Sequence, residues 1–308
     1  MRATVAPAPA KLNSESVFVT AHDGLTLHVR AYGARTAAGW PVVCLPGLSR
    51  TNADFETLAL ALSCDAARPR RVLALDYRGR GRSDHDRNPK NYSFPTELAD
   101  VLAVLTALAA LPAIFVGTSR GGILTMLLAA ARPTAIAGAI LNDIGPVVEP
   151  KGLMRIKGYV GKLPAPKTFE EGAELLRRLF SAQFPLLTEA DWLAASRKNW
   201  EERSGRLVPT YDPKLAKTLN GIDLEHPLPP LWAQFDGLAR VPVMVIRGAN
   251  SDILSPATVE AMQARRPELE VIEVADQGHA PLLEDAASIA RIAAFVGRCD
   301  GVHPGGRS

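Results

Sequence analysis

Ser119 stands in a five-residue pattern, G-T-S-R-G, with a glycine two positions before it and another two positions after it. A short apolar run at residues 114–116 precedes the pattern, and an apolar segment with helical spacing at residues 123–131 follows it. This order of strand, sharp turn and helix is the setting in which such a serine acts as a nucleophile. The glycines permit a tight turn, so the hydroxyl projects from the sheet edge near a helix N-terminus. We therefore predict a nucleophilic serine, with a glycine-rich helix cap as the structural alternative.

A serine hydroxyl is a weak nucleophile unless a base accepts its proton, and His279 is the candidate base. It lies in the sequence Q-G-H-A-P, between the last apolar run of strand type, residues 271–274, and the last helical pattern, residues 289–296. If the strands are parallel, this position falls at the same sheet edge as Ser119. The other five histidines lie in a hairpin, a charged loop, an insertion or a terminal tail. We predict that His279 is the general base.

The base in turn needs a carboxylate that fixes its tautomer and stabilises the imidazolium. Asp252 follows the penultimate strand, residues 243–246, and reaches the same sheet edge. Asp143 ends an earlier strand, residues 139–141, and competes for the same role; Asp276 is a third carboxylate. We prefer Asp252 because the chain order Ser, Asp, His then places the acid and the base after the last two strands. In that case Asp143 orients the turn into the following segment.

An acyl-transfer site also needs two backbone N–H groups for the oxyanion of the tetrahedral intermediate. Arg120 follows the nucleophile and supplies one from the start of a helix. Leu48, in the turn after the strand at residues 42–45, supplies the other. Two roles are open for the Arg120 side chain. It binds a substrate carboxylate, or it forms a salt bridge or lies in solvent.

The elements that position these residues alternate between strand and helix. An Asp-Gly pair joins the first two strands as an antiparallel hairpin. Short apolar runs then alternate with amphipathic helical segments, which is typical of a mostly parallel sheet covered on both faces. The apolar runs are at residues 42–45, 71–75, 114–116, 139–141, 243–246 and 271–274.

One segment, residues 146–232, interrupts the alternation. It contains no apolar run of the kind that forms a buried strand, but it holds ten of the 24 prolines and three of the four tryptophans. This composition indicates a separate, mainly helical insertion. We interpret Trp192, Trp200 and Trp232 as the insertion's own core, with substrate contact as the alternative. The predicted organisation is a flexible N-terminal tail, a core in two pieces, this helical cap inserted between them, and a C-terminal tail. The corresponding residues are 1–16, 17–145 with 233–298, 146–232, and 299–308.

Composition excludes several classes of protein. The 308 residues carry a net charge of +3, from 35 Lys and Arg against 32 Asp and Glu, which argues against a nucleic-acid-binding protein. Three scattered cysteines are too few for a disulfide framework and favour a cytoplasmic location. The six histidines show no metal-ligand spacing, so we expect neither metal nor cofactor. The apolar stretch at residues 101–117 is too short and interrupted to span a membrane.

Taken together, these motifs resemble the α/β-hydrolase superfamily, of the capped esterase and carbon–carbon hydrolase type, over residues 17–296. The matching motifs are L-P-G at residues 45–47, D-Y-R-G-R-G-R-S-D at 76–84, the serine motif at 117–122, G-A-N-S-D at 248–252 and G-H at 278–279. The resemblance implies an eight-stranded, mostly parallel sheet with an antiparallel second strand and a helical cap over a site made by Ser119, Asp252 and His279. Many members have His-Gly at the oxyanion turn, where this chain has Pro-Gly.

The reaction expected from these residues is hydrolysis of a carboxylic ester through an acyl-enzyme, because family branches that attack alkyl carbon use aspartate at the nucleophile position. The substrate is expected to be a small, partly apolar molecule. One alternative is a carbon–carbon bond hydrolase acting on a β-diketone-like substrate, for which relatives use the same triad. Another is a small-molecule sensor that binds in the pocket and turns over slowly.

Overall fold

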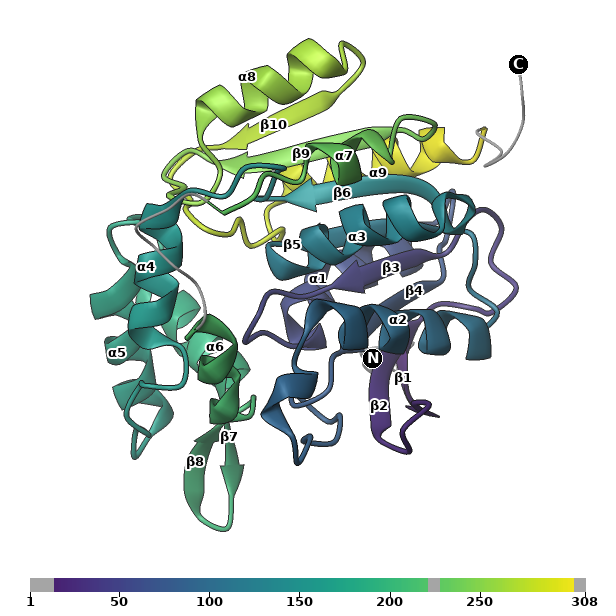
Figure 1. The fold of residues 1–308 in the computed structure, drawn as a ribbon. Coiled ribbons are helices and arrows are strands. Elements are labelled where there is room, and N and C mark those ends of the chain that lie inside the picture. The colour runs from purple at the N-terminus through teal and green to yellow at the C-terminus, as the bar shows by residue number, and fades with distance from the viewer. Residues whose placement is uncertain (1–13, 221–227, 302–308) are drawn as a thin grey trace, which may run out of the picture.

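A single eight-stranded sheet organises the molecule (Figure 1). The computed structural model describes residues 14–220 and 228–301. The strand order is β1-β2-β4-β3-β5-β6-β9-β10, and β2 alone runs in the direction opposite to that of the other seven strands. The predicted α/β-hydrolase fold, with its mostly parallel sheet, is confirmed. The strands are β1 (Ser14–Thr20), β2 (Thr26–Tyr32), β3 (Val42–Leu45), β4 (Val72–Asp76), β5 (Ala113–Thr118), β6 (Ile136–Asn142), β9 (Val243–Gly248) and β10 (Glu270–Val274).

Helices cover both faces of the sheet, which is why its central strands are continuous apolar runs rather than alternating ones. Alternate residues of one strand enter two different cores: Val43 and Leu45 of β3 join one, whereas Val42 and Cys44 join the other. Residues of α2, α3, α7 and α8 contribute to the first core and residues of α1 and α9 to the second. The helices are α1 (Glu56–Ser63), α2 (Phe94–Ala107), α3 (Arg120–Ala131), α7 (Trp232–Asp236), α8 (Pro256–Arg265) and α9 (Ala286–Cys299).

The segment between β6 and β9, here called the insertion (residues 146–232), packs beside the sheet rather than within it (Figure 1). It contains a two-stranded hairpin that the sequence did not indicate. The hairpin turns at Ser204 and Gly205, both at positive φ. Only one residue of each strand is buried, so the strands lack a buried apolar run. The elements are α4 (Pro150–Tyr159), α5 (Phe169–Phe180), α6 (Glu189–Asn199), β7 (Trp200–Arg203) and β8 (Arg206–Pro209).

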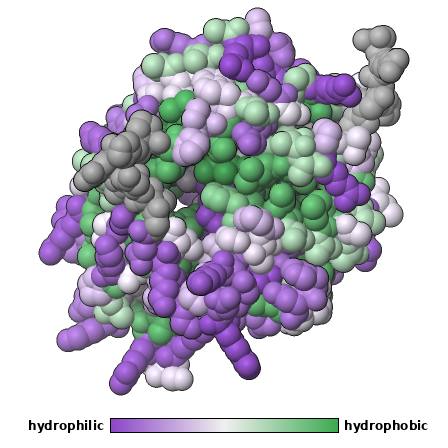
Figure 2. All heavy atoms as spheres, in the orientation of Figure 1, coloured by the Kyte–Doolittle hydropathy of each residue, from purple (hydrophilic) through white to green (hydrophobic). Residues whose placement is uncertain are grey.

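The tryptophans of this segment divide between two cores. Trp192 and Trp200 pack in a small cluster inside the insertion. Trp232, expected in the same cluster, instead lies in α7, where it packs against the main core with its ring at 79° to that of Phe235. Figure 2 shows polar side chains gathered around the hairpin and an apolar band over α3. The insertion is thus a small packed unit with its own core and a polar outer end.

The chain ends depart slightly from expectation. Strand β1 begins at Ser14, which pairs with Tyr32, so part of the expected N-terminal tail belongs to the sheet. Helix α9 continues to Cys299, one residue into the expected C-terminal tail. Residues 1–13 and 302–308 of the two expected tails lie outside the described residues. Within the described ranges, no helix combines the length and apolar character that crossing a membrane requires.

Candidate active site

Ser119 occupies the sharp turn between β5 and α3, with φ of 51° and ψ of −112°. A non-glycine residue seldom adopts positive φ, and strain of this kind is concentrated at functional sites. The flanking glycines are required by close packing: a Cβ on Gly121 would lie 2.0 Å from the Leu45 carbonyl oxygen, and one on Gly117 would lie 2.5 Å from the Gly122 nitrogen. The turn therefore presents Ser119 as the sequence pattern predicts.

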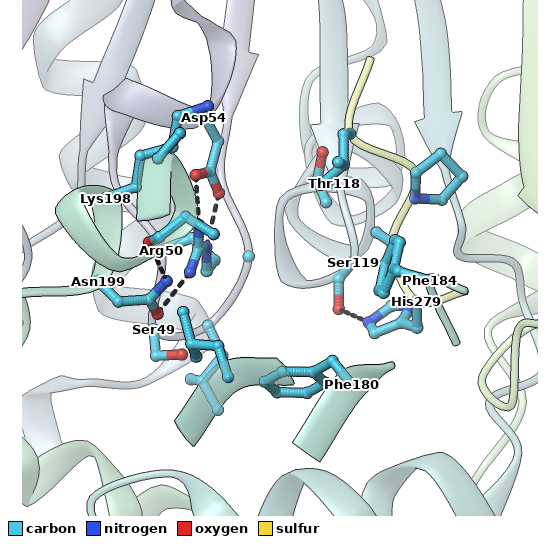
Figure 3. A pocket seen from close by; sticks show the side chains of 18 of the residues that line it. Ser49, Arg50, Asp54, Thr118, Ser119, Phe180, Phe184, Lys198, Asn199 and His279 are labelled. Carbon is cyan, nitrogen blue, oxygen red and sulfur yellow. Dashed lines mark hydrogen bonds and ion pairs between the residues drawn. The ribbon is translucent and has the colours of Figure 1, made fainter. Parts of the chain in front are cut away.

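The Ser119 hydroxyl and the His279 ring are in hydrogen-bond contact (Figure 3). His279 lies on the loop between β10 and α9, and its Nε2 is 2.9 Å from Ser119 Oγ. Its Nδ1 is 2.7 Å from Asp143 Oδ2. Because a carboxylate can only accept, Nδ1 carries the proton toward Asp143, which leaves Nε2 to accept from the serine hydroxyl. The two side chains predicted as nucleophile and base thus meet in the geometry that this role requires.

Asp143, rather than the preferred Asp252, is the carboxylate that contacts the histidine. It directly follows β6, adopts a φ of 53°, and is fully buried. Besides the histidine, it accepts from the Gly248 N–H at 2.9 Å and from the Ser251 hydroxyl at 2.6 Å. Three donors from two neighbouring loops therefore fix the direction of its carboxylate.

The pairing expected for Asp252 is corrected by the structure. Asp252 lies in the loop after β9, where the Ser251 N–H bonds back to the Gly248 carbonyl and turns the chain. The serine hydroxyl points toward Asp143, whereas Asp252 forms two hydrogen bonds with Arg155 of α4, at 2.7 and 2.8 Å. Burial works against ionisation of Asp252, but hydrogen bonding and charge from Arg155 outweigh it and hold the pKa of Asp252 below its ordinary value.

The loop after β3 passes beside the nucleophile. A Cβ built on Gly47 would lie 3.9 Å from Ser119 Cβ, and Leu48 lines the cavity in front of the serine. Arg120 is the first residue of α3, where backbone N–H groups have no acceptor within the helix. Of the two residues expected to supply oxyanion donors, Arg120 therefore directly follows Ser119 in the chain, and Leu48 lines the same cavity as Ser119.

The Arg120 side chain does not line this cavity. Its Nε donates to Glu97 at 2.6 Å, and its guanidinium lies 4.0 Å from the centre of the Phe94 ring. Of the two roles considered for this side chain, the structure shows the salt bridge.

A cavity of about 480 Å³ opens in front of Ser119, between the core and the insertion. Its walls are largely apolar, with Ile156, Leu176, Phe180, Phe184 and Trp192 contributed by the insertion. Such a lining suits a small, partly apolar molecule. The described residues contain no group of three or more His, Cys, Asp or Glu side chains that could hold a metal ion.

One wall of the cavity is polar, and sequence reasoning missed it. Figure 3 shows Arg50 and its partners across the cavity from Ser119. Arg50 forms two hydrogen bonds with Asp54, at 2.7 and 2.6 Å, and a third with Asn199 of the insertion at 2.6 Å. Burial disfavours the charged guanidinium, but Asp54 outweighs it and raises the pKa of Arg50. The only signal in the sequence was the position of Arg50 just after the predicted oxyanion turn.

Comparisons with known proteins identify a family and relatives of this chain. A model described as "Alpha/beta hydrolase family" matches residues 42–292. The 3-hydroxybutyrate-oligomer hydrolase of Cupriavidus necator is 36% identical over 258 residues, which cover 81% of this chain and 85% of that protein. The 2-(acetamidomethylene)succinate hydrolase of Mesorhizobium japonicum is 25% identical over 256 residues, covering 83% and 85%.

The fold is also that of a solved structure. A crystal structure of an alpha/beta hydrolase from Novosphingobium aromaticivorans has a TM-score of 0.84 and 39% sequence identity, and the match covers 94% of this chain and all of that one. Sheet order, serine turn and family match lead to one conclusion: the chain belongs to the alpha/beta hydrolase family.

Proposed function

We propose that this protein is a serine hydrolase that cleaves a carboxylic ester through an acyl-enzyme intermediate. The observation that carries the proposal is the continuous hydrogen-bonded series from the Ser119 hydroxyl through the His279 ring to Asp143, with distances of 2.9 and 2.7 Å. This arrangement makes the hydroxyl nucleophilic only while an acceptor holds the ring in the correct tautomer. Asp143 replaces Asp252 as the proposed acid.

In the first half of the reaction, His279 Nε2 takes the hydroxyl proton as Ser119 Oγ bonds to the ester carbonyl carbon. The carbonyl π electrons move to the oxygen, and the Leu48 and Arg120 N–H groups stabilise that oxyanion. When the intermediate collapses, the bond to the alcohol oxygen breaks and His279 gives its proton to the leaving alcohol. Asp143 stabilises the imidazolium throughout.

In the second half, water replaces the alcohol. His279 takes a proton from the water as its oxygen attacks the acyl carbon, and the same two N–H groups stabilise the second oxyanion. Collapse breaks the bond to Ser119 Oγ, which regains its proton from the imidazolium, and the carboxylic acid leaves. The insertion, as the proposed cap, supplies most of the apolar walls that surround the acyl or alcohol group.

For the substrate, we propose a short oligoester of a hydroxy acid. The relative at 36% identity is named a 3-hydroxybutyrate-oligomer hydrolase. The cavity supports such a substrate because its apolar walls suit the short alkyl groups, while Arg50, Asp54 and Asn199 form a polar wall that can meet a terminal hydroxyl or carboxyl group. The cavity is of a size that suits one small molecule.

The test compares the unaltered protein with Ser119→Ala on 3-hydroxybutyrate dimers and trimers and on a short chromogenic ester. We expect the unaltered protein to hydrolyse these esters and to be labelled by a fluorophosphonate, and the variant to lose both properties while its circular dichroism spectrum is unchanged. Activity retained by the variant would remove Ser119 from the mechanism. Ligand-dependent thermal stabilisation without labelling would favour a sensor, and turnover of a β-diketone but of no ester would favour carbon–carbon hydrolysis.

A further inference from the structure

Three charged side chains, Arg80, Glu97 and Arg120, form a buried cluster directly behind the site. Glu97 lies on α2 with its side chain completely buried. Its two carboxylate oxygens accept from different arginines: Oε1 from Arg80 Nη1 at 2.7 Å, and Oε2 from Arg120 Nε at 2.6 Å. A buried charge is costly unless it is paired, so a cluster of this kind constrains the positions of all its members.

Each arm of the cluster ends at a residue proposed to stabilise the oxyanion. The Arg80 Nε donates to the Leu48 carbonyl at 2.8 Å, and this guanidinium is itself fully buried. Arg120 directly follows Ser119, and its own backbone N–H is the other proposed donor. Glu97 therefore connects, through two ion pairs, the loop after β3 with the beginning of α3.

We propose that Glu97 is a positioning residue for the oxyanion hole, holding the Leu48 and Arg120 N–H groups at the separation that suits the tetrahedral intermediate. The proposal rests on the proposed function, because it requires these two groups to face a developing oxyanion. Glu97 touches no substrate and acts only through Arg80 and Arg120.

The physical reason is electrostatic. With Glu97 ionised, a carboxylate lies between two guanidinium groups and attracts both. Without that charge, two buried cations repel one another in a medium of low dielectric constant, and the Leu48 loop and the start of α3 move apart. Donors that are displaced by a fraction of an ångström lose stabilisation of the transition state, whereas the apolar walls that bind the substrate keep their shape.

The same helix offers a matched control. Asp100 lies three residues after Glu97 and is also buried, and it accepts from Arg78 at Nε and Nη2, both at 2.6 Å. The side-chain hydrogen bonds of Arg78 go to Asp100, Asp23 and Asp86, and none goes to Glu97, Leu48 or Arg120. Glu97→Gln and Asp100→Asn therefore each replace one buried carboxylate by an amide of nearly the same shape, but only the first acts on the proposed oxyanion donors.

The experiment measures kcat and KM on a chromogenic ester, the inhibition constant of an alkyl boronic acid, which forms a tetrahedral adduct with serine, and the melting temperature. For Glu97→Gln we expect kcat to fall by about 10- to 100-fold, KM to change by less than about 3-fold, and boronic acid affinity to fall in parallel with kcat. For Asp100→Asn we expect the melting temperature to fall about as far as it does in Glu97→Gln. Its kcat, in contrast, should stay within about 2-fold of the kcat of the unaltered protein.

Three results would overturn the proposal: an unchanged kcat in Glu97→Gln, a loss confined to KM, or equal losses of kcat in both variants. If Glu97→Gln does not fold, Arg120→Met decides the question, because it removes one arm and leaves the neutral Arg80–Glu97 pair. A folded Arg120→Met protein with undiminished kcat would contradict the proposal. Failure of the proposed function is separate, since it would show as no ester turnover and no labelling of Ser119 in the unaltered protein.

Discussion

Two neighbouring strand ends, those of β6 and β9, each deliver an aspartate to the same edge of the sheet, and the two carboxylates make different contacts. Asp143 comes immediately after β6 and is fully buried between His279, Gly248 and Ser251. Asp252 comes four residues after the end of β9, and its side chain keeps 13% of its surface exposed. One faces the histidine, and the other faces a helix of the insertion.

The difference shows that arrival at a sheet edge does not by itself assign a role to a carboxylate. What decides is the path of the chain after the strand. The positive φ of Asp143 directs its side chain toward His279. The turn after β9 instead brings the Ser251 hydroxyl to the Asp143 carboxylate, and Asp252 lies beyond that contact. Asp252 then joins the core to the insertion through Arg155.

The largest expected effect separates the two carboxylates directly. We expect Asp143→Asn to lower kcat by about 10³- to 10⁴-fold, because an amide in this position no longer fixes the histidine tautomer or stabilises the imidazolium. The kcat of Asp252→Asn is expected to stay within about 10-fold of that of the unaltered protein, since the partner of Asp252 lies in the insertion. Steady-state kinetics on one chromogenic ester measures both. A larger loss in Asp252→Asn would reverse the assignment.

The next effect concerns the backbone that holds Asp143. A Cβ on Gly248 would lie 2.4 Å from the Gly278 carbonyl oxygen and 2.5 Å from that of Gln277, next to the histidine loop. We expect Gly248→Ala to destabilise the fold by about 1–3 kcal/mol and to lower kcat, because either the histidine loop or the Gly248 N–H must shift.

Gly158→Ala is the control for this variant, because a Cβ at this position of α4 meets nothing within 4 Å. It should be neutral or stabilise by up to about 1 kcal/mol, as alanine does in helices. Chemical denaturation measures both variants. Equal stability of the two proteins would show that the loops after β9 and β10 accommodate a methyl group.

A smaller effect is expected where Asp252 meets the insertion. Arg155→Met leaves a half-buried carboxylate without its cation, which we expect to destabilise the protein by about 1–2 kcal/mol and to raise KM several-fold by loosening α4 over the cavity. Arg178→Met, which removes an exposed partner of Glu174, should leave the stability unchanged, because solvent screens this pair. A KM unaffected by Arg155→Met would show that the pair does not hold the cavity wall.

The smallest effect is a pH dependence of the same pair. The pKa of folded Asp252 lies below its ordinary value, so the carboxylate binds fewer protons in the folded than in the unfolded chain. Its contribution to stability is therefore complete above about pH 4 and is lost as the pH falls through the folded-state pKa. Melting temperatures measured between pH 6 and the acid limit should fall less steeply in Arg155→Met than in the unaltered protein. Parallel acid limbs in the two proteins would contradict this account.

Patterns that depend on neighbours in the chain predicted much of this protein. The serine turn requires glycines at fixed offsets between a strand and a helix, so a few consecutive residues around Ser119 are enough to predict it. The buried parallel strands are apolar runs because both of their faces are covered, which gives the fold class. His279 was identifiable because it alone among the histidines follows a strand of this type.

The choice between alternative partners far apart in the chain was not predicted. Asp143 and His279 are separated by 136 positions, and the choice between two aspartates depended on how each loop turns in space. The polar wall of the cavity likewise joins Arg50 to Asn199, 149 positions away, and no local pattern indicates such a contact.

Local sequence patterns were enough to predict the sheet, the serine turn and the histidine that contacts it, because each follows from hydrophobic periodicity and turn chemistry within a short stretch of chain. Tertiary structure alone decided which carboxylate serves the histidine and which ties the insertion to the core. The physical reason is that a hydrogen bond depends on separations of a few tenths of an ångström and on direction, and these are set only when two distant loops pack against each other.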